Sequence, residues 1–408
     1  MPGLRPSAED LAAAVADSLV VSVDQGARDA CIYYYFRAAP WIQVVVDGVR
    51  KSPDEQVRSL GERLLGSPAD PSCYQSFKQA LLATRDDDPS TAELFEAAWQ
   101  AECHSRLGYH LGSRYTDDGA PSVTADDLAG VSPVNRPAAD RDAELAVVIP
   151  FRDRNPGQGR LRNLLASLLA LGDQSYPRER YRLVVVESDD RPRHRELIEG
   201  LVDTYLFAPN AGTFNKSWAV NVGVVNAADA AEAVCILDAD VLTDGDFIAR
   251  NAERFRRRGT AGHLTFRNMF CLSETASSSA IRQRLVQGAA MPDTETLRGF
   301  VMRRPPGATV WARTGTFHLI GGMDERFEGW GGEDNDFVYR MDINSAFDSY
   351  DDWLLHMHHP PSSYIDEDGG LPNDAIPALS WGPGQPIGRI DRFSAEAAGG
   401  PDPRAHGM

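Results

Sequence analysis

The chain lacks long apolar runs and cysteine pairs, and both absences restrict where it can work. Its 408 residues contain no run of eighteen or more apolar positions, so we expect no membrane-spanning helix. The N-terminus lacks the apolar stretch of a secretory signal. The five cysteines are widely spaced and form no CxxC pair, which argues against a disulfide framework and a cysteine zinc site. A reducing cytoplasm is therefore the expected compartment.

Positive charge is scarce relative to negative charge. Lysine and arginine number 41 against 59 aspartates and glutamates, which gives a net charge of −18. Nucleic-acid backbones and anionic membranes recruit basic residues, so we expect no nucleic-acid partner. With 42% hydrophobic and 25% charged residues, the composition is that of a soluble globular protein with a sizeable core.

The hydrophobic pattern divides the chain into four regions. Residues 1–110 have apolar residues at helical spacing, which predicts a mainly helical accessory region without a chemistry motif. Residues 111–143 lose this periodicity, as a linker does. From 144 to 365, apolar strands alternate with helices, which predicts an α/β fold with a mostly parallel sheet covered by helices. The tail at 366–408 is rich in Pro, Gly and Asp and is expected to be poorly ordered.

Two carboxylates directly follow an apolar stretch that has the pattern of a buried strand. Asp238-Ala239-Asp240 comes after Val-Cys-Ile-Leu at 234–237. Side chains two residues apart on an extended segment point the same way, so both carboxylates would converge at a strand end, where open α/β sheets bind ligands. A divalent cation relieves their repulsion, and a diphosphate completes its coordination. The plainer interpretation is a solvated acidic turn.

A glycine-rich segment, Gly-Trp-Gly-Gly-Glu-Asp at 329–334, precedes residues with helical spacing. Glycines permit a tight backbone and close approach of a ligand. Glu333 and Asp334 then lie near a helix N-terminus, where the dipole favours ionised carboxylates. A general base that deprotonates an attacking hydroxyl must be ionised. Composition alone also allows acidic capping after a glycine-rich turn.

Three histidines lie within four residues, in His356-Met357-His358-His359. Together with Asp240 they predict a divalent-metal site with carboxylate and imidazole ligands, which suits Mn²⁺, with Mg²⁺ as the alternative. The cluster alone does not indicate which histidine is a ligand.

Aromatic and basic residues at the ends of the predicted strands suit a nucleotide. Aromatic rings would face a base, and cations would face a diphosphate. Taken singly, each of these segments is more often an ordinary loop. The residues that we assign to the nucleotide are Pro150, Phe151, Arg152, Arg154, Glu187, Phe214 and Lys216.

The order of four segments along the chain resembles that of the inverting β-1,4-galactosyltransferases. These are Pro-Phe-Arg-Asp-Arg at 150–154, Phe-Asn-Lys at 214–216, Asp-Ala-Asp at 238–240 and Gly-Trp-Gly-Gly-Glu-Asp at 329–334. The second half is also similar to the N-acetylgalactosamine-transferring domain of bacterial chondroitin synthases, through Gly-Gly-Met-Asp-Glu-Arg-Phe at 321–327 and Tyr-Arg at 339–340. The similarity covers roughly residues 145–361, about half of the chain, and the run at 329–334 is specific.

The resemblance implies a metal-dependent enzyme of the GT-A fold that moves a hexose or N-acetylhexosamine from a UDP-sugar to a hydroxyl acceptor. It implies that Asp334 is the catalytic base and Glu333 orients the acceptor. Asp240 would bind the metal, and Asp238 would contact the donor ribose or the metal shell. Trp330 matches a tryptophan on a loop that closes over the donor. The positions that match nucleotide contacts are Pro150, Phe151, Arg152, Phe214 and Lys216.

The chain departs from these families at several positions. Lys216 stands where the animal enzymes usually have arginine, so one diphosphate contact would be monodentate instead of bidentate. The animal enzymes have Met-x-x-His at the metal, a spacing that His356 and His359 occupy, whereas the chondroitin enzymes have one histidine before a Pro-Pro pair. This comparison favours His356, then His359, then His358 as ligands. Residues 274–305 have no counterpart.

Other functions fit parts of the pattern. Retaining polypeptide N-acetylgalactosaminyltransferases share a Trp-Gly-Gly-Glu segment but usually have Asp-x-His where this chain has Asp-Ala-Asp. A sugar nucleotidyltransferase would need a glycine-rich, lysine-bearing loop, which residues 152–159 lack. A non-catalytic sugar-binding or scaffold protein would not need the acidic residues and histidines. The acceptor, whether a glycan, a peptide, a lipid-linked sugar or a small metabolite, is not indicated.

Overall fold

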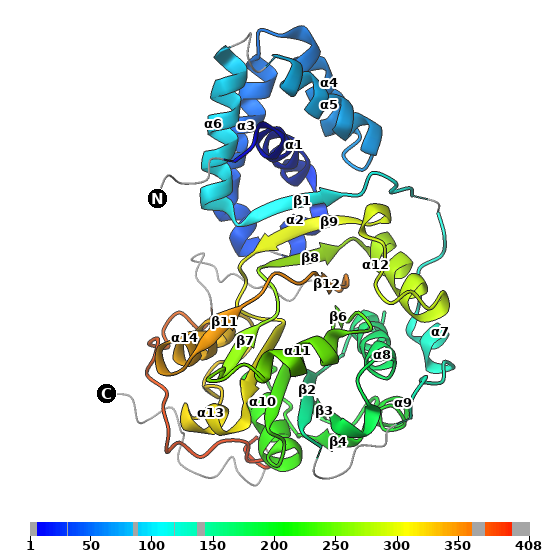
Figure 1. The fold of residues 1–408 in the computed structure, drawn as a ribbon, viewed down its shortest axis with the longest axis vertical. Helices are drawn as coiled ribbons and strands as arrows, with labels where there is room; N and C mark the ends of the chain where they lie inside the picture. Colours follow the sequence, from blue (N-terminus) through cyan, green and yellow to red (C-terminus); the bar gives the residue numbers. More distant parts are fainter. Residues whose placement is uncertain are drawn as a thin grey trace.

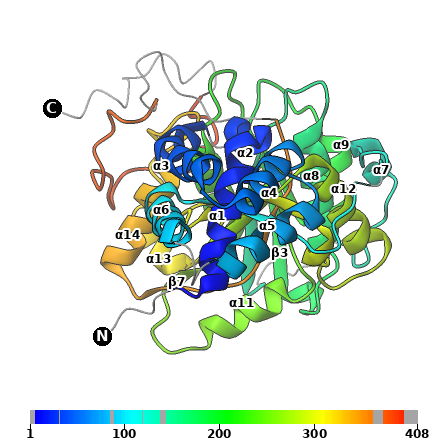
Figure 2. The ribbon, with the colours of Figure 1, turned by 90° about the horizontal axis from the view of Figure 1, so that it is seen from above.

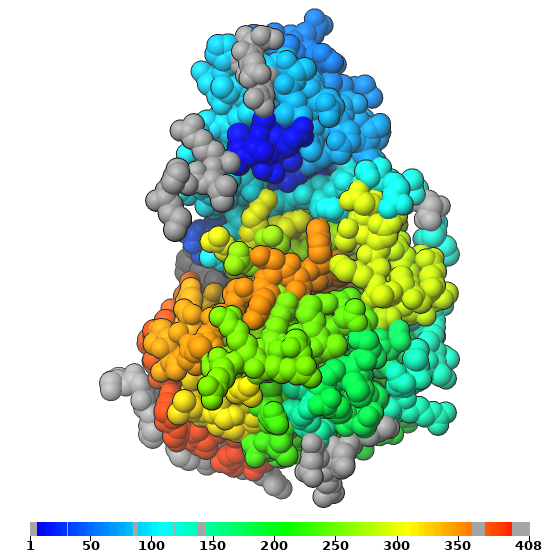
Figure 3. All heavy atoms as spheres, in the orientation of Figure 1, coloured from blue at the N-terminus to red at the C-terminus, as the bar shows by residue number. Residues whose placement is uncertain are grey.

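Two regions of different architecture lie one above the other in the computed structural model (Figure 1). The structure describes residues 6–30, 32–84, 89–117, 119–136, 143–360 and 372–393. The space-filling view shows the helical region, in blue and cyan, resting on the yellow and green surface of the α/β domain (Figure 3). The domain boundaries predicted above remain predictions.

The upper region is helical, as the sequence predicts. Apolar residues on one face of each helix pack together, and α1 lies between the other helices (Figure 2). The capping box of Ser7 and Asp10 begins α1, and the Ser7 hydroxyl oxygen accepts the Asp10 amide hydrogen at 3.1 Å. The helices are α1 (Ala8–Val23), α2 (Gln25–Ala30), α3 (Ile32–Lys51), α4 (Glu55–Gly66), α5 (Pro71–Thr84) and α6 (Pro89–Ser105).

The α/β domain is built on a seven-stranded sheet in the order β11-β7-β10-β5-β2-β3-β4. Within this sheet, as far as the structure describes it, the pairs β2–β3, β2–β5, β3–β4 and β7–β11 are parallel. Strand β10 alone runs antiparallel to both of its neighbours, β5 and β7. The predicted α/β class with a mostly parallel sheet is therefore confirmed. The strands are β2 (Leu145–Phe151), β3 (Tyr181–Glu187), β4 (Thr204–Phe207), β5 (Ala233–Leu237), β7 (Gly262–Leu264), β10 (Thr309–Arg313) and β11 (Phe347–Ser349).

Helices cover both faces of this sheet because its central strands are apolar on both sides. Val147 and Ile149 of β2 pack in one core cluster with the leucines of α8 (Gly159–Leu171). Ala146 and Val148 belong to a second cluster, with Trp218 of α10 (Lys216–Gly223). The alternation of strand side chains explains the continuous apolar runs in the sequence.

A second sheet of five strands, in the order β1-β9-β8-β12-β6, joins the two regions. Its strand β1 follows α6 directly and pairs antiparallel with β9, with Leu107 opposite Met302. The sequence pattern does not predict this sheet, since β1 ends the helical region and β9 lies in the segment 274–305, where we found no motif. The strands are β1 (Leu107–Leu111), β6 (Val241–Leu242), β8 (Asn268–Leu272), β9 (Arg298–Arg303) and β12 (Leu354–His356).

Shorter elements complete the domain. One turn of 3₁₀ helix covers Arg178–Arg180 and another Thr294–Thr296, and π-helical turns at Val224–Ala228 and Arg282–Val286 extend α10 and α12. None of the helices in the described ranges is long and apolar enough to cross a membrane. The remaining helices are α7 (Ala125–Ala129), α9 (Arg195–Ile198), α11 (Phe247–Phe255), α12 (Glu274–Ile281), α13 (Thr314–Leu319) and α14 (Glu333–Asn344).

Part of the predicted tail lies against the α/β domain. The Trp218 indole donates a hydrogen bond to the Arg389 carbonyl at 2.8 Å, and the Trp381 indole donates to the Gly321 carbonyl at 2.7 Å. Residues 372–393 therefore differ from the expectation of poor order, because aromatic side chains anchor an otherwise polar segment. Residues 366–371 and 394–408 lie outside the described residues.

Candidate active site

A cavity of about 440 Å³ lies where β2 and β5 end. It occupies the carboxyl edge of the parallel strands, the position at which α/β sheets bind ligands. Segments far apart in sequence meet there. The predicted site residues that line it are Pro150, Phe151, Arg152, Arg154, Phe214, Lys216, Asp238, Asp240, Trp330, Glu333, Asp334 and His359.

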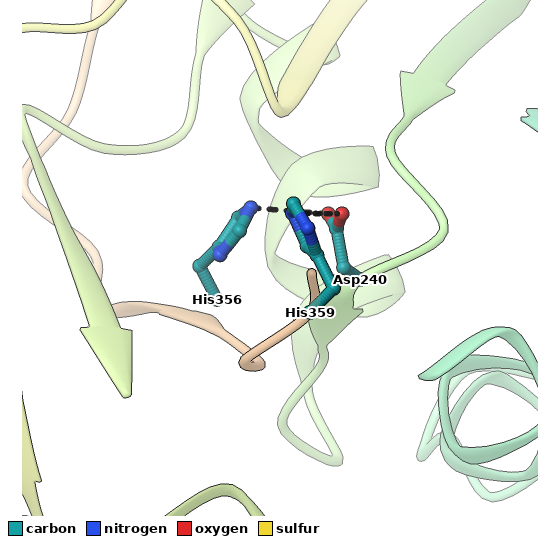
Figure 4. Close-up of side chains that lie close together, drawn as sticks. All are labelled: Asp240, His356 and His359. Carbon is teal, nitrogen blue, oxygen red and sulfur yellow. Dashed lines mark ion pairs between the residues drawn. The ribbon is translucent and has the colours of Figure 1, made fainter. Parts of the chain in front are cut away.

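Asp240, His356 and His359 form the group predicted to hold a metal. Their candidate ligand atoms all lie within 4.8 Å of one another. The Nε2 atom of His356 lies 3.3 Å from Oδ1 of Asp240, and that of His359 lies 3.1 Å from Oδ2 (Figure 4). The short strands β6 and β12 bring them together, since the amide of Met357 donates to the Asp240 carbonyl at 2.8 Å.

The chemistry of this group suits a divalent cation. The Oδ1 atom of Asp240 is buried and accepts no hydrogen bond from the residues that the structure describes. Burial would raise the pKa of Asp240, but the two neighbouring imidazoles hold that pKa below its usual range. Burial lowers the pKa of His356 to about 4, so this ring is neutral at pH 7. A carboxylate and a neutral imidazole are thus available as metal ligands.

His358, the third histidine of the cluster, points to a different partner. Its Nδ1 atom lies 2.8 Å from Oε2 of Glu274, and its amide donates to the Ser277 hydroxyl at 2.7 Å. Both partners belong to α12, so the structure separates His358 from Asp240.

Lys216 connects the two acidic motifs. Its ammonium lies 2.7 Å from Oδ1 of Asp238 and 3.0 Å from Oδ1 of Asp334. The Asn215 side chain caps α10 and fixes the start of this helix, accepting from the Trp218 amide at 2.8 Å. Burial alone would lower the pKa of Lys216, but the two carboxylates hold its pKa well above the ordinary value. Lys216 is therefore a fixed positive charge in the cavity wall.

Glu333 and Asp334 begin α14, as the sequence predicts, after two glycines with positive φ angles of 101° at Gly331 and 95° at Gly332. Burial and the neighbouring Asp334 charge raise the pKa of Glu333 to about 7. Burial also raises the pKa of Asp238 to about 6, against the opposing effect of Lys216. The cavity wall therefore contains closely spaced acidic groups around a single ammonium group, that of Lys216.

Arg152 and Arg154 hold the loop that follows β4 beside the cavity. The Arg152 guanidinium donates to the carbonyls of Gly212 and Asn210, each at 2.7 Å. Its Cζ atom lies 5.3 Å from the centre of the Phe214 ring. Arg154 donates through Nε to Asp189 at 2.7 Å. Both side chains line the cavity while fixing its shape.

Glu187 is the predicted site residue that lies apart from the others. It ends β3 and is fully buried, and it does not line the cavity. Its carboxylate accepts from the amides of Arg193 and His194 at 3.0 and 3.1 Å and from the Tyr205 hydroxyl. These contacts tie the loop after β3 to β4, so the carboxylate is occupied within the protein.

Sequence reasoning missed Arg160, which lies in the first turn of α8 and lines the cavity. Its guanidinium donates to the Pro360 carbonyl at 3.0 Å, and its charge contributes to the lowered pKa of Asp240. The sequence did offer a signal for this residue, because a basic side chain at a helix start follows shortly after the predicted nucleotide segment at 150–154. Tyr33 and Tyr34, from the helical region, line an adjoining cavity and carried no motif.

Two family models match the chain. Residues 146–301 match the model described as glycosyl transferase family 2, and residues 306–346 match the one described as the N-terminal domain of galactosyltransferase. The first match includes residues 274–301, so the expectation that the segment 274–305 has no counterpart was wrong for most of its length. No curated protein matches. The second segment contains the glycine-rich loop with Glu333 and Asp334.

Solved structures with low sequence identity overlap with part of the chain. A mannosyltransferase from Pyrobaculum calidifontis, in complex with GDP-Man and Mn²⁺, is 15% identical with a TM-score of 0.36, covering 60% of this chain and 64% of its own. The match thus spans less than two thirds of that enzyme. The catalytic domain of Drosophila β1,4-galactosyltransferase 7, with xylobiose, is 16% identical with a TM-score of 0.31, covering 55% and 76%. TarS of S. aureus is 13% identical with a TM-score of 0.37, covering 52% and 60%.

The two matched segments contribute all the central strands of the parallel sheet and both acidic motifs of the cavity. The α/β domain of this chain is thus similar to glycosyltransferases of these two families.

Proposed function

We propose that the protein is an inverting, metal-dependent glycosyltransferase that moves a hexose or N-acetylhexosamine from a UDP-sugar to a hydroxyl group. The observation that carries this proposal is one cavity, which is lined both by Asp334 and by Asp240 and His359 of the group that could hold a metal. Metal ligands on one side and a carboxylate on the other suit the displacement of a diphosphate by an oxygen nucleophile.

Asp240, His356 and His359 would hold the cation. Their mixed oxygen and nitrogen atoms favour Mn²⁺, with Mg²⁺ as the alternative. When bound, the cation would supply positive charge for the departing diphosphate. Arg160 and Lys216 line the same cavity and would add fixed positive charge beside it.

The remaining residues would bind the donor and exclude water. Pro150, Phe151 and Phe214 offer an apolar wall for the uracil, beside the loop that Arg152 and Arg154 hold. Trp330 lies in the glycine-rich loop and lines the cavity, so closure of this loop would cover the donor. Glu187 has no part in this proposal because its carboxylate is occupied by its own chain.

The chemical step is a single displacement. The acceptor oxygen bonds to the anomeric carbon while the bond from that carbon to the diphosphate breaks and its electron pair leaves with UDP. Asp334 takes the hydroxyl proton, and Glu333 beside it orients the acceptor. The cysteines are widely spaced and form no CxxC pair, which suits a reducing compartment, and we place the reaction in the cytoplasm.

The substitution Asp334→Asn tests the assignment of the base. It keeps the shape of the side chain but removes the proton acceptor, so we expect sugar transfer at least about 100-fold slower. UDP affinity in the presence of Mn²⁺, measured by calorimetry, should remain close to that of the wild type. The matched control is Asp342→Asn, an exposed residue of the same helix. Normal turnover by Asp334→Asn would refute the assignment.

The anomeric configuration of the product tests the stereochemistry. NMR of the first product formed from an α-linked UDP-sugar should show a β-linkage. An α-linked product would instead support a retaining enzyme, the alternative that the Trp-Gly-Gly-Glu segment leaves open.

A further inference from the structure

A second cavity of about 190 Å³ lies on the other side of the expected base. The residues that line both cavities are Asp238, Trp330, Glu333, Asp334 and His359. Asp334 therefore faces two spaces at once. A base that deprotonates one substrate as it attacks another must lie between the two, so the second cavity is where the attacking hydroxyl would arrive.

The floor of this second cavity is apolar because two antiparallel strands present one face to it. Met269 of β8 stands opposite Met302 of β9, and Cys271 stands opposite Phe300. Residues two apart on a strand share a face, so these four side chains form a continuous surface. Met269, Phe300 and Met302 are each less than 9% exposed.

Another part of the wall comes from the helical region. Tyr33 and Tyr34, at the start of α3, line the cavity, and their ring centres lie 5.4 Å apart in an edge-to-face arrangement. The guanidinium of Arg106 lies 5.7 Å from the centre of the Tyr34 ring, and the Arg106 carbonyl accepts from the Arg303 amide at 2.8 Å. The junction of β1 with β9 thus places these tyrosines over the cavity.

Both polar and apolar side chains line this cavity. Glu333, Asp334 and Asn335 and the three histidines of 356–359 line it together with the methionines, Phe300 and the two tyrosines. A polar sugar suits the polar residues, but it would leave the apolar floor uncovered. Burial of an apolar group on that floor is favourable in proportion to the area removed from water.

We infer that the second cavity is the acceptor site and takes a hydroxyl acceptor with an apolar group, such as an aryl or alkyl glycoside, held between the β8–β9 floor and Tyr33 and Tyr34. The inference rests on the proposed function, because it takes Asp334 to be the base. It gives the helical region a role as one wall of the acceptor site.

Binding of matched glycosides tests the inference without any variant. Methyl, phenyl and n-octyl glycosides of glucose, galactose, N-acetylglucosamine and xylose are titrated into the wild-type protein with UDP and Mn²⁺ present, the octyl compounds below their micellar concentrations. For at least one sugar, the phenyl or octyl compound should bind about tenfold or more tightly than the methyl compound. A preference for phenyl would indicate an aromatic aglycone, and a preference for octyl an alkyl chain. Equal affinities of all three forms for every sugar would overturn the inference.

Variants of the helical wall test its contribution. Tyr33→Ala and Tyr34→Ala together should remove most of the preference for the apolar glycoside, and Tyr34→Phe should keep it, because the ring and not the hydroxyl makes the wall. The matched control is Phe36→Ala, on the same helix, 49% exposed and outside the cavity lining. An unchanged preference in a folded double variant, judged by circular dichroism, would remove the tyrosines from the site.

The same titrations separate this inference from the proposed function. If UDP with Mn²⁺ binds but no glycoside shows the preference, the acceptor inference alone fails. If UDP does not bind with Mn²⁺, the proposed function fails, and the acceptor inference fails with it.

Discussion

At the scale of single residues, the position of Asp334 depends on a glycine in another segment. A Cβ atom placed on Gly307 would lie only 2.0 Å from Oδ2 of Asp334. The backbone before β10 therefore approaches the expected base more closely than any other residue type would permit. Gly307 belongs to the catalytic geometry although it carries no functional group.

The substitution Gly307→Ala should displace Asp334 and slow transfer. A misplacement of about 1 Å costs on the order of 100-fold in rate, so kcat should fall by about that factor while UDP affinity with Mn²⁺ changes little. The control is Gly315→Ala in α13, where an added Cβ would meet nothing within 4 Å. Equal kcat values for the two variants would contradict the argument.

Glu333 links stability to pH in the metal-free protein. Its pKa, raised to about 7 by burial and by Asp334, exceeds the ordinary value of 4.5, so the folded state holds this proton more tightly than the unfolded state. Stability should therefore decrease as pH rises from about 4.5 to 7, by on the order of 2 kcal/mol for this group.

Urea denaturation between pH 4.5 and 8 measures this effect. The decrease should be smaller in Glu333→Gln, which cannot ionise, than in the wild type or in Glu253→Gln, a control at an exposed position. A decrease of the same size in all three proteins would assign the pH dependence to other groups.

At the scale of elements, the pairing of β6 with β12 brings the proposed metal ligands together. Asp240 precedes β6 and His356 ends β12, with His356 opposite Val241 in the pairing. The turn after β12 then directs His359 toward Asp240 and His358 toward α12. His356 and His359 thus both face Asp240, whereas His358 faces α12.

Single histidine substitutions should show this division. His356→Ala and His359→Ala should each weaken Mn²⁺ binding more than about tenfold in the presence of UDP, since each removes a ligand. His358→Ala is the matched control and should bind Mn²⁺ like the wild type. Calorimetric titration provides the measurement, and a loss of affinity in His358→Ala as large as that in His359→Ala would reject the assignment.

The parallel strands could be predicted from sequence because burial on both faces produces uninterrupted apolar runs, as at 145–149 and 234–237. The segment that contains Val44, Val45 and Val46 would favour a strand by local preference alone. It forms α3 because Ile42, Val45, Val46 and Val49 are buried on one face. Tertiary packing overrides the local preference there.

The five-stranded sheet and the acceptor wall could not be predicted from the sequence pattern. Strands β6 and β12 have two and three residues, too few for any periodicity, and their partners are distant in sequence. Glu187 was expected to contact the nucleotide, and it ends β3. Only the fold of the following loop, whose amides bind its carboxylate, places it elsewhere.

At the scale of the whole molecule, the two regions share one core. A single cluster of buried apolar residues extends from α1, with Leu19, through β1, with Leu107 and Tyr109, to β2, with Val147. The pairing of β1 with β9 adds backbone hydrogen bonds across the same boundary. The strand that the helical region donates covers the edge of β9, which would otherwise be unpaired.

Because the core is continuous, the two regions should unfold in one transition. In the variant Trp41→Phe/Trp99→Phe, the remaining tryptophans lie in the α/β domain and its tail, so fluorescence reports on that part alone. Far-UV circular dichroism of the same variant reports on the helical region as well. The replaced side chains are 39% and 40% exposed, so the core is little changed.

The two signals should give the same midpoint in urea, and UDP with Mn²⁺ should shift both midpoints together, since a ligand bound in one part stabilises the whole cooperative unit. Two separate midpoints, with only the fluorescence transition shifted by ligand, would mean that the helical region folds independently. Its tyrosines would then be held over the acceptor cavity only as firmly as the β1–β9 contact allows.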